Sequence, residues 1–205
     1  MTTGLRERHK QEVRQSISGA AMRLFAAGSF DEVTIAQVAA AAGVSKMTVT
    51  NYFPRKEDLV FDRAEVTIRS VAEAVAARAP GESVLAAIRR DYAARIAAGD
   101  VTLGPPSAAF ARMVQTSHVL SSRWREIADL GEQALGDAIA AETGVDDVQQ
   151  RIVAAQLASV HRVLFADGAR RILAGRPREE IRQALAEAAG RAFDRLEPSL
   201  GSYGV

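Results

Sequence analysis

The sequence predicts an all-α protein with an N-terminal three-helix head that contains a helix-turn-helix, followed by a larger helical bundle, about nine helices in all. Three observations predict it. Alanine is abundant and aromatic residues make up only 5% of the chain, which favours helix. Apolar residues recur at spacings of three and four near the N-terminus. Two N-terminal helix-capping residues, Thr34 and Ser45, are separated by a short segment that contains a single glycine, Gly43. We expect the head to span residues 1–54 and the bundle residues 55–205.

The first helix is expected from about Arg6 to Ala27. Its apolar residues lie three and four positions apart, so they share one helix face. They are Val13, Ile17, Ala20, Ala21, Leu24 and Phe25. Gly28 follows as a C-cap, because glycine readily adopts the left-handed conformation that ends many helices.

The second and third helices form the predicted helix-turn-helix. A T-x-x-Q capping box begins at Thr34, so a helix should start near Ile35 and end near Ala42. Gly43 supplies the turn, and Ser45 is a natural N-cap for a third, short helix. A connection this short holds two helices at a steep angle. The small core of the motif should comprise Ile35, Val38, Ala39, Val44, Val49 and Phe53.

The rest of the chain predicts a succession of longer helices. Pro54 can open a fourth helix over roughly Arg55 to Ala79, which "PG" at Pro80 ends. The later helices are expected at about Ser83–Ala98, Ser107–Thr116, Ser122–Glu142, Asp146 or Asp147 to Ala174, and Pro177–Leu196. The stretch GDVTLGPP, Gly99–Pro106, is the clearest loop.

Composition excludes several classes of protein. The chain has no cysteine, which excludes a disulfide framework and cysteine-based zinc or thiol chemistry. No apolar stretch approaches the ~18 residues of a membrane span, and the N-terminus is charged where a signal peptide needs an apolar core. We therefore expect a cytoplasmic protein that does not associate with a membrane. The formal net charge is +1, so any contact with nucleic acid must come from a local patch.

Catalytic signatures are missing from the sequence. It contains no glycine-rich phosphate loop, no H-E-x-x-H pair and no nucleophile elbow, and it has three histidines. The segment GESVL at residues 81–85 lacks the second glycine of G-x-S-x-G. An enzyme is therefore not predicted, and neither a cofactor nor a metal is expected.

The predicted third helix carries many polar side chains beside few apolar ones. An ordinary surface helix would carry them without any special role. A capped helix and a tight turn precede this one, however, and its N-terminus directs free N–H groups outward, which suits a phosphate. The side chains that can reach phosphates or base edges are Lys46, Thr48, Thr50, Asn51 and Tyr52.

The segment TIAQVAAAAGVSKMTVTNYFPRKEDLV resembles the DNA-binding segment of the tetracycline-repressor (TetR) family of bacterial regulators. In that family a threonine and an Ile-Ala pair precede Ala-Gly-Val-Ser, a short recognition helix that ends in an aromatic pair, and Lys-Glu-x-Leu. The resemblance covers about residues 10–60, and the rest of the chain agrees only in length and helical character. The matching residues are Thr34, Ile35, Ala36, Ala42, Gly43, Val44, Ser45, Thr48, Tyr52, Phe53, Lys56, Glu57 and Leu59.

Two residues depart from the family pattern. Met47 stands where a small residue, often glycine, is common, and Thr50 stands where an aromatic is common. Both lie on or beside the predicted reading face. Met47 suits contact with a thymine methyl group, and Thr50 offers a smaller hydrogen-bonding group. The operator sequence therefore does not follow from that of relatives.

The resemblance implies a set of DNA contacts. Thr34, Tyr52 and Lys56 would hold phosphates. Bases would be approached by Lys46, Met47, Thr48 and Asn51, with Thr48 alternatively on a phosphate. By donor and acceptor pattern, Asn51 suits adenine and Lys46 suits guanine. The full predicted DNA-binding set is Thr34, Ser45, Lys46, Met47, Thr48, Thr50, Asn51, Tyr52 and Lys56. The N-terminal basic residues either add phosphate or minor-groove contacts or form a solvated end; they are Arg6, Arg8, Lys10 and Arg14.

The middle helices of the bundle are expected to enclose a ligand pocket. An apolar pocket with one or two polar groups would suit a drug-like or lipid-like molecule. The alternative is that each candidate residue belongs to an ordinary helical core or, for His118, to the solvated surface. The candidates are Phe110, Met113, Val114, His118, Trp124, His161 and Phe165.

Each of the last two helices is apolar on more than one face, so each must bury more than one of its faces. One face can pack into the core of the bundle, and another can contact a second copy of the chain. The resemblance implies that these two helices form a four-helix bundle with the same two helices of the second copy. Alternatively, all of these residues are internal core. The interface candidates are Phe165, Ala169, Ile172, Ile181, Leu185, Ala188 and Ala192.

These features predict a ligand-responsive, DNA-binding transcriptional regulator. The expected partners are double-stranded DNA with a palindromic operator, a second copy of the chain, and an unknown small-molecule effector. We expect a repressor that a small apolar or amphipathic effector releases from its operator. Two alternatives stay open: a transcriptional activator, and a helical small-molecule sensor that no longer reads DNA specifically.

Overall fold

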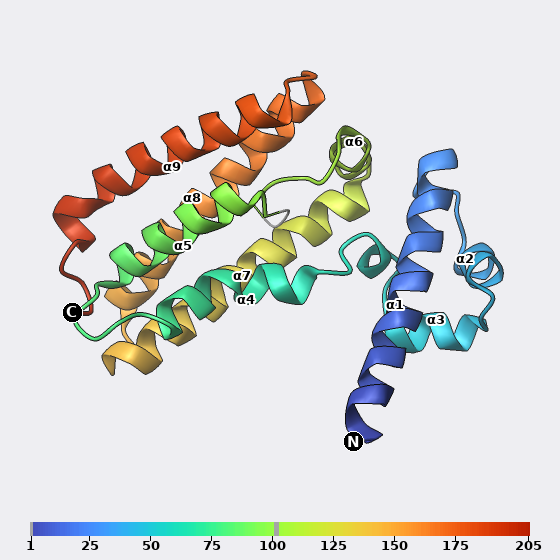
Figure 1. Cartoon of the computed structure of the whole chain (residues 1–205), viewed down its shortest axis with the longest axis horizontal. Helices are drawn as coiled ribbons and strands as arrows, with labels where there is room; N and C mark the ends of the chain where they lie inside the picture. The colour runs from blue at the N-terminus through green and yellow to red at the C-terminus, as the bar shows by residue number, and fades with distance from the viewer. Residues whose placement is uncertain (1, 101–102) are drawn as a thin grey trace. The chain divides into compact units, whose positions relative to one another are not determined.

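The computed structural model describes residues 2–100 and 103–205, and these residues form helices and connecting loops without any strand (Figure 1). The all-α prediction is therefore confirmed. The elements are α1 (Thr2–Ala27), α2 (Ile35–Ala42), α3 (Lys46–Tyr52), the 3₁₀ helix η1 (Lys56–Leu59), α4 (Ala64–Ala76), α5 (Val84–Ala98), α6 (Ala108–Thr116), α7 (His118–Thr143), α8 (Val148–Leu173) and α9 (Arg178–Leu200).

The chain divides into two compact units. The N-terminal unit comprises Met1–Ala64 together with Gln115–Arg123, and the C-terminal unit comprises Glu65–Val114 together with Trp124–Val205. The N-terminal unit thus includes residues 55–64, which the sequence analysis assigned to the bundle. It also includes the first residues of α7, so the boundary between the units falls inside one continuous helix.

The core of the N-terminal unit follows the pattern predicted from α1. Side chains at spacings of three and four on α1 are buried together with apolar residues of α2 and α3, whereas Ile35 and Val44 are half-buried. The buried apolar residues of this unit are Ile17, Ala20, Ala21, Phe25, Phe30, Val33, Val38, Ala39, Val49, Phe53, Leu59, Val60, Phe61 and Leu120.

The prediction of one long helix from Arg55 to Ala79 is wrong. The chain instead forms η1, leaves the helical path, and starts α4 at Ala64. Three successive apolar residues, Leu59, Val60 and Phe61, are all buried, and three neighbours cannot share one face of an α-helix. The next residue, Asp62, is held by α1, because Ser18 donates to its carboxylate at 2.9 Å and Arg14 donates to its carbonyl at 3.1 Å.

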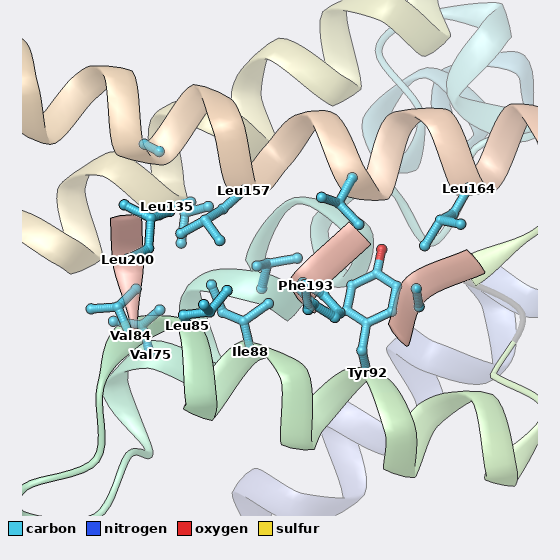
Figure 2. Close-up of a cluster of buried hydrophobic side chains, with 14 of the residues drawn as sticks. Val75, Val84, Leu85, Ile88, Tyr92, Leu135, Leu157, Leu164, Phe193 and Leu200 are labelled. Carbon is cyan, nitrogen blue, oxygen red and sulfur yellow. The ribbon is translucent and has the colours of Figure 1, made fainter. Parts of the chain in front are cut away.

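The core of the C-terminal unit lies between α4, α5, α7, α8 and α9. Figure 2 shows side chains from these five helices packed against one another, with Val75, Ile88, Leu135, Leu157 and Phe193 among them. The Tyr92 ring rises from α5 within this core, and its hydroxyl is directed towards α8 (Figure 2). Tyr92 is therefore the one tyrosine of the described residues that is buried in this core and brings a hydroxyl to a neighbouring helix.

From α5 onward the helices begin and end close to their predicted bounds, except that α7 starts at His118 rather than near Ser122 and α9 ends at Leu200 rather than near Leu196. Asp147 caps α8 by accepting the Gln150 N–H at 2.8 Å. Val101 and Thr102 of the predicted loop lie outside the described residues. None of the described helices combines the length and the apolar character needed to cross a bilayer.

Candidate nucleic-acid interface and ligand cavity

Local sequence signals build the α2–turn–α3 motif. Thr34 and Gln37 form the predicted capping box: the Gln37 N–H donates to the Thr34 hydroxyl at 3.3 Å, and the Thr34 N–H donates to the Gln37 side chain at 2.7 Å. Gly43 ends α2 with a positive φ of 68°, which a residue with a Cβ adopts only at a cost. Ser45 then caps α3 by accepting the Thr48 N–H at 3.0 Å. The segment is a helix-turn-helix.

Helix α3 has one buried side and one open side. Val49 and Phe53 are almost fully buried. The open side carries Lys46, Met47, Thr50 and Asn51, which we call the reading face, and Met47 is 69% exposed. Thr48 and Tyr52 are half-buried at its edges. Four of the predicted DNA-binding side chains therefore remain accessible on one side of a short, capped helix.

Two hydroxyls of the motif are already hydrogen-bonded within the chain. The Thr50 hydroxyl donates to the carbonyls of Lys46 and Met47 at 3.3 and 3.1 Å. The Ser45 hydroxyl pairs with the Thr48 hydroxyl at 2.9 Å. Thr50 thus directs its hydroxyl at its own helix, which leaves its methyl group as the part best placed for an outside contact.

Arg14 differs from the other N-terminal basic residues. Its guanidinium donates to the carbonyls of Tyr52 and Asp62 at 3.0 and 3.1 Å and lies 4.4 Å from the centre of the Phe53 ring. Arg14 therefore ties α1 to the end of α3, a role that neither alternative stated for the N-terminal basic residues included. Its partners are 38 and 48 residues away along the chain, so no local sequence pattern predicts these contacts. Arg6, Arg8 and Lys10 are exposed.

Lys56, a predicted phosphate contact, packs against the loop between α1 and α2. Its Nζ donates to the Asp31 carbonyl at 3.3 Å and lies 4.5 Å from the centre of the Phe30 ring. Partial burial lowers the Lys56 pKa, against the opposing influence of Asp31 and Glu57. The side chain must leave these contacts, or share its ammonium with them, to reach a phosphate.

An ion pair within the N-terminal unit was not foreseen. Arg123, near the start of α7, donates through Nη2 and Nε to one carboxylate oxygen of Asp58 at 2.8 and 3.1 Å. Both side chains are only 15% exposed. The other carboxylate oxygen accepts the Arg55 N–H at 3.1 Å. The pair fixes η1, a few residues after the reading face, to α7.

Comparison with known proteins identifies this arrangement. Residues 17–62, which contain the whole helix-turn-helix, match the family model for bacterial regulatory proteins of the tetR family. The chain carries a DNA-binding domain of the TetR type at residues 17–62. It is therefore a DNA-binding transcriptional regulator rather than an enzyme, as the sequence analysis predicted.

Individual TetR-family proteins resemble the chain over nearly its whole length. It is 27% identical to the HTH-type transcriptional regulator TcmR of Streptomyces glaucescens, over 96% of this chain and 88% of that protein. Two solved structures share the fold. A TetR-family regulator from Streptomyces coelicolor has a TM-score of 0.53 at 20% identity, over 90% and 96% of the two chains. The TetR-family repressor AlkX from Dietzia has a TM-score of 0.52 at 16% identity, over 90% and 98%.

Two of the seven predicted pocket residues line a small cavity in the C-terminal unit. Trp124 of α7 and His161 of α8 line it, and Phe165 stacks on Trp124 with 3.9 Å between ring centres. Its volume is about 30 Å³. Phe110, Met113 and Val114 of α6 do not line this cavity, and His118 is exposed in the N-terminal unit. The lining residues are Thr67, Ile68, Val71, Trp124, Ile127, Ala128, Asp129, Gly131, Glu132, Leu135, Ala158, His161 and Arg162.

Only one of the two ring nitrogens of His161 has a hydrogen-bond partner among the described residues. His161 Nδ1 lies 2.6 Å from the Tyr92 hydroxyl. Part of the residue is accessible to solvent, but Nε2 is buried and has no hydrogen-bond partner among the described residues. Burial lowers the His161 pKa to about 4, with a smaller contribution from Arg95, so the imidazole is neutral at pH 7. Burial also raises the pKa of Tyr92, which keeps its proton.

Most interface candidates pack within their own chain. Phe165 and Leu185 are buried, and Ile181, Ala188 and Ala192 pack against the core of the C-terminal unit. Ala169 and Ile172 are half-buried, and Ile172, Ile181 and Leu185 line a groove of about 340 Å³. A different stripe of α8 is open: Ile152 and Val163 are 45% and 59% exposed, and because they are eleven positions apart they lie on one face of the helix.

Proposed function

We propose that this regulator is a repressor that binds a palindromic operator as a homodimer and leaves it when a small apolar or amphipathic molecule occupies the C-terminal unit. The observation that carries the proposal is the reading face of α3, which is open, polar and held on a capped helix. A bacterial regulator acts on the chromosome, so we place the protein in the cytoplasm.

The reading face supplies both kinds of DNA contact. Asn51 is suited to the N6 and N7 atoms of adenine, and Lys46 to the acceptors of guanine. Met47 offers an apolar contact to a thymine methyl group. The remaining predicted residues hold phosphates or set the position of α3; they are Thr34, Ser45, Thr48, Tyr52 and Lys56. Since Thr50 bonds to its own helix, its contribution is apolar.

Selection of bound sites from a random duplex pool tests this function. We expect a palindrome, because two copies of the head read two half-sites. Asn51→Ala and Lys46→Ala should each weaken binding to the selected site by ~10–100-fold, since a specific base contact is worth about 1–3 kcal/mol. Arg23→Ala removes one exposed positive charge from α1 and serves as the control, with little effect. Binding without sequence preference that neither variant alters would refute the assignment and favour the sensor alternative.

The second copy is expected to cover the exposed α8 stripe. Two apolar residues this exposed on one face of a helix favour burial of that face by a partner. Val163→Glu should weaken the dimer by about 3 kcal/mol or more, because it buries an unpaired charge. Sedimentation at several protein concentrations measures the change. Val66→Glu, at a similarly exposed valine on α4, is the control. A Val163→Glu protein that remains dimeric would exclude this stripe.

Release by the effector requires only a modest coupling. A ligand that prefers one spacing of the two heads, when the operator prefers another, shifts the population of dimers. A coupling of about 1–3 kcal/mol is enough for induction. A reporter gene behind the selected operator, with and without the regulator, distinguishes repression from activation.

A further inference from the structure

We infer that the effector carries an uncharged oxygen acceptor, a ketone, ester or amide carbonyl, which accepts a hydrogen bond from His161 Nε2 in the cavity beside Trp124. This inference rests on the proposed function, because it names the chemical class of the molecule that the C-terminal unit recognises. It depends on the tautomer of His161, on the charges around the cavity and on the size of the cavity.

Counting hydrogen-bond partners favours one tautomer of His161 over the other. If Tyr92 donates to Nδ1, the imidazole proton lies on Nε2, and a single buried donor is left without a partner. If Nδ1 donates to the Tyr92 oxygen instead, both the tyrosine proton and the bare Nε2 lack partners. An unsatisfied buried polar atom costs about 1–3 kcal/mol, so the first arrangement is the more stable one. Nε2–H is therefore a hydrogen-bond donor without an acceptor among the described residues.

The charges around the cavity favour a neutral acceptor over a carboxylate. Asp129 and Glu132 line the cavity with one opposing cation, Arg162, which leaves one excess negative charge. Arg95, the cation that lowers the His161 pKa, is paired with Asp91 and Asp100 at 3.3 and 3.0 Å. A ligand carboxylate would meet like charge and a neutral imidazole, whereas a carbonyl oxygen loses little on leaving water.

The size of the cavity indicates where the carbonyl sits. Its 30 Å³ admits a group about the size of one or two water molecules, and His161 Nε2 is itself buried, so a ligand oxygen reaches Nε2 only after a small shift of the lining side chains. The rest of the ligand must displace lining side chains and then lie against apolar surface such as Trp124 and Ile127. Trp124 is the only tryptophan of the chain, so its fluorescence reports directly on entry.

The test uses the full-length protein with three probes that share a benzene ring: acetophenone, ethylbenzene and benzoate. Nitrogen-15 labelling of the three histidines gives few ring signals, and the His161→Gln spectrum assigns the one that disappears. We expect the free protein to show the Nε2–H tautomer. Acetophenone should shift the His161 signal and change Trp124 fluorescence, and ethylbenzene and benzoate should bind about tenfold more weakly, the value of one hydrogen bond.

Two variants isolate the hydrogen bond. His161→Phe should remove the preference for acetophenone over ethylbenzene while binding of ethylbenzene persists. Tyr92→Phe keeps the imidazole but removes the group that fixes its tautomer, so the tautomer signals should become mixed and the preference should fall. The wild-type measurements need neither variant to fold. An Nδ1–H tautomer in the free protein, equal affinities for acetophenone and ethylbenzene, or no shift up to the solubility limit of acetophenone would each overturn the inference.

Operator binding measured on the same samples separates this inference from the proposed function. Protein that binds the selected palindrome but does not discriminate acetophenone from ethylbenzene retains the proposed function and overturns the inference. Protein that binds acetophenone through His161 but selects no DNA sequence supports the ligand chemistry and contradicts the proposed regulator.

Discussion

Arg123→Met is expected to destabilise the N-terminal unit by about 3 kcal/mol, because it leaves the largely buried Asp58 carboxylate without its cation. The cost falls on η1 and the start of α7, which the pair connects. Hydrogen exchange in the full-length protein measures the effect locally. We expect faster exchange in residues 46–62 and unchanged exchange in the core of the C-terminal unit.

A double-mutant cycle identifies the pair as the cause. Asp58→Asn in the Arg123→Met background removes the unpaired charge, so part of the lost stability should return. Arg23→Met, at an exposed arginine of α1, controls for the general loss of a positive charge. If the double variant is as unstable as the sum of the single variants, Arg123 stabilises the unit through other contacts.

Phe53→Ala should cost the N-terminal unit about 3–5 kcal/mol and abolish operator binding. Phe53 is 1% exposed, and its ring is covered by the Arg14 guanidinium. Its removal leaves a cavity under α3 and takes away the surface on which Arg14 rests. Urea unfolding followed by the helical circular dichroism signal, together with DNA binding, checks both effects.

The neighbouring aromatic residue provides the matched control. Tyr52 is half-buried at the edge of the reading face and is a proposed phosphate contact. Tyr52→Ala should therefore weaken DNA binding while costing about 1 kcal/mol of stability or less. Equal losses of stability at the two positions would show that the division of α3 into a buried side and a reading face is incorrect.

The helix-turn-helix could be predicted because it depends on interactions between residues close in sequence. Contacts between residues distant in sequence could not be predicted. The capping box at Thr34 and the turn at Gly43 each depend on partners within five residues, so the residue types and their spacing can be recognised in the sequence. The break after Leu59 depends on Ser18 and Arg14 holding Asp62, which are more than forty residues away. No local pattern records such partners, and the helix was therefore predicted to continue.

The pocket residues proposed from the sequence stay a prediction. Trp124 and His161 were candidates because bulky and titratable residues on middle helices are typical of pockets, and both line the small cavity, whereas Phe165 stacks on Trp124 without lining it. Tyr92 was missed, although its hydroxyl determines what His161 can offer a ligand. A tyrosine on an apolar helix face gives no sign of which residue its hydroxyl will reach from 69 positions away.

The N-terminal unit is built from two separate stretches of chain, and this bears on how such regulators can be recombined. A fragment that ends at Ala64 lacks Leu120, which is fully buried, and Arg123, the partner of Asp58. Fusion of residues 1–64 to another protein therefore transfers the reading face without part of its support. We therefore expect an exchange to transfer the folded head only when it carries the chain through residue 123, and with it a large share of the C-terminal unit. The N-terminal unit of this protein is therefore not contained in one continuous segment of the chain.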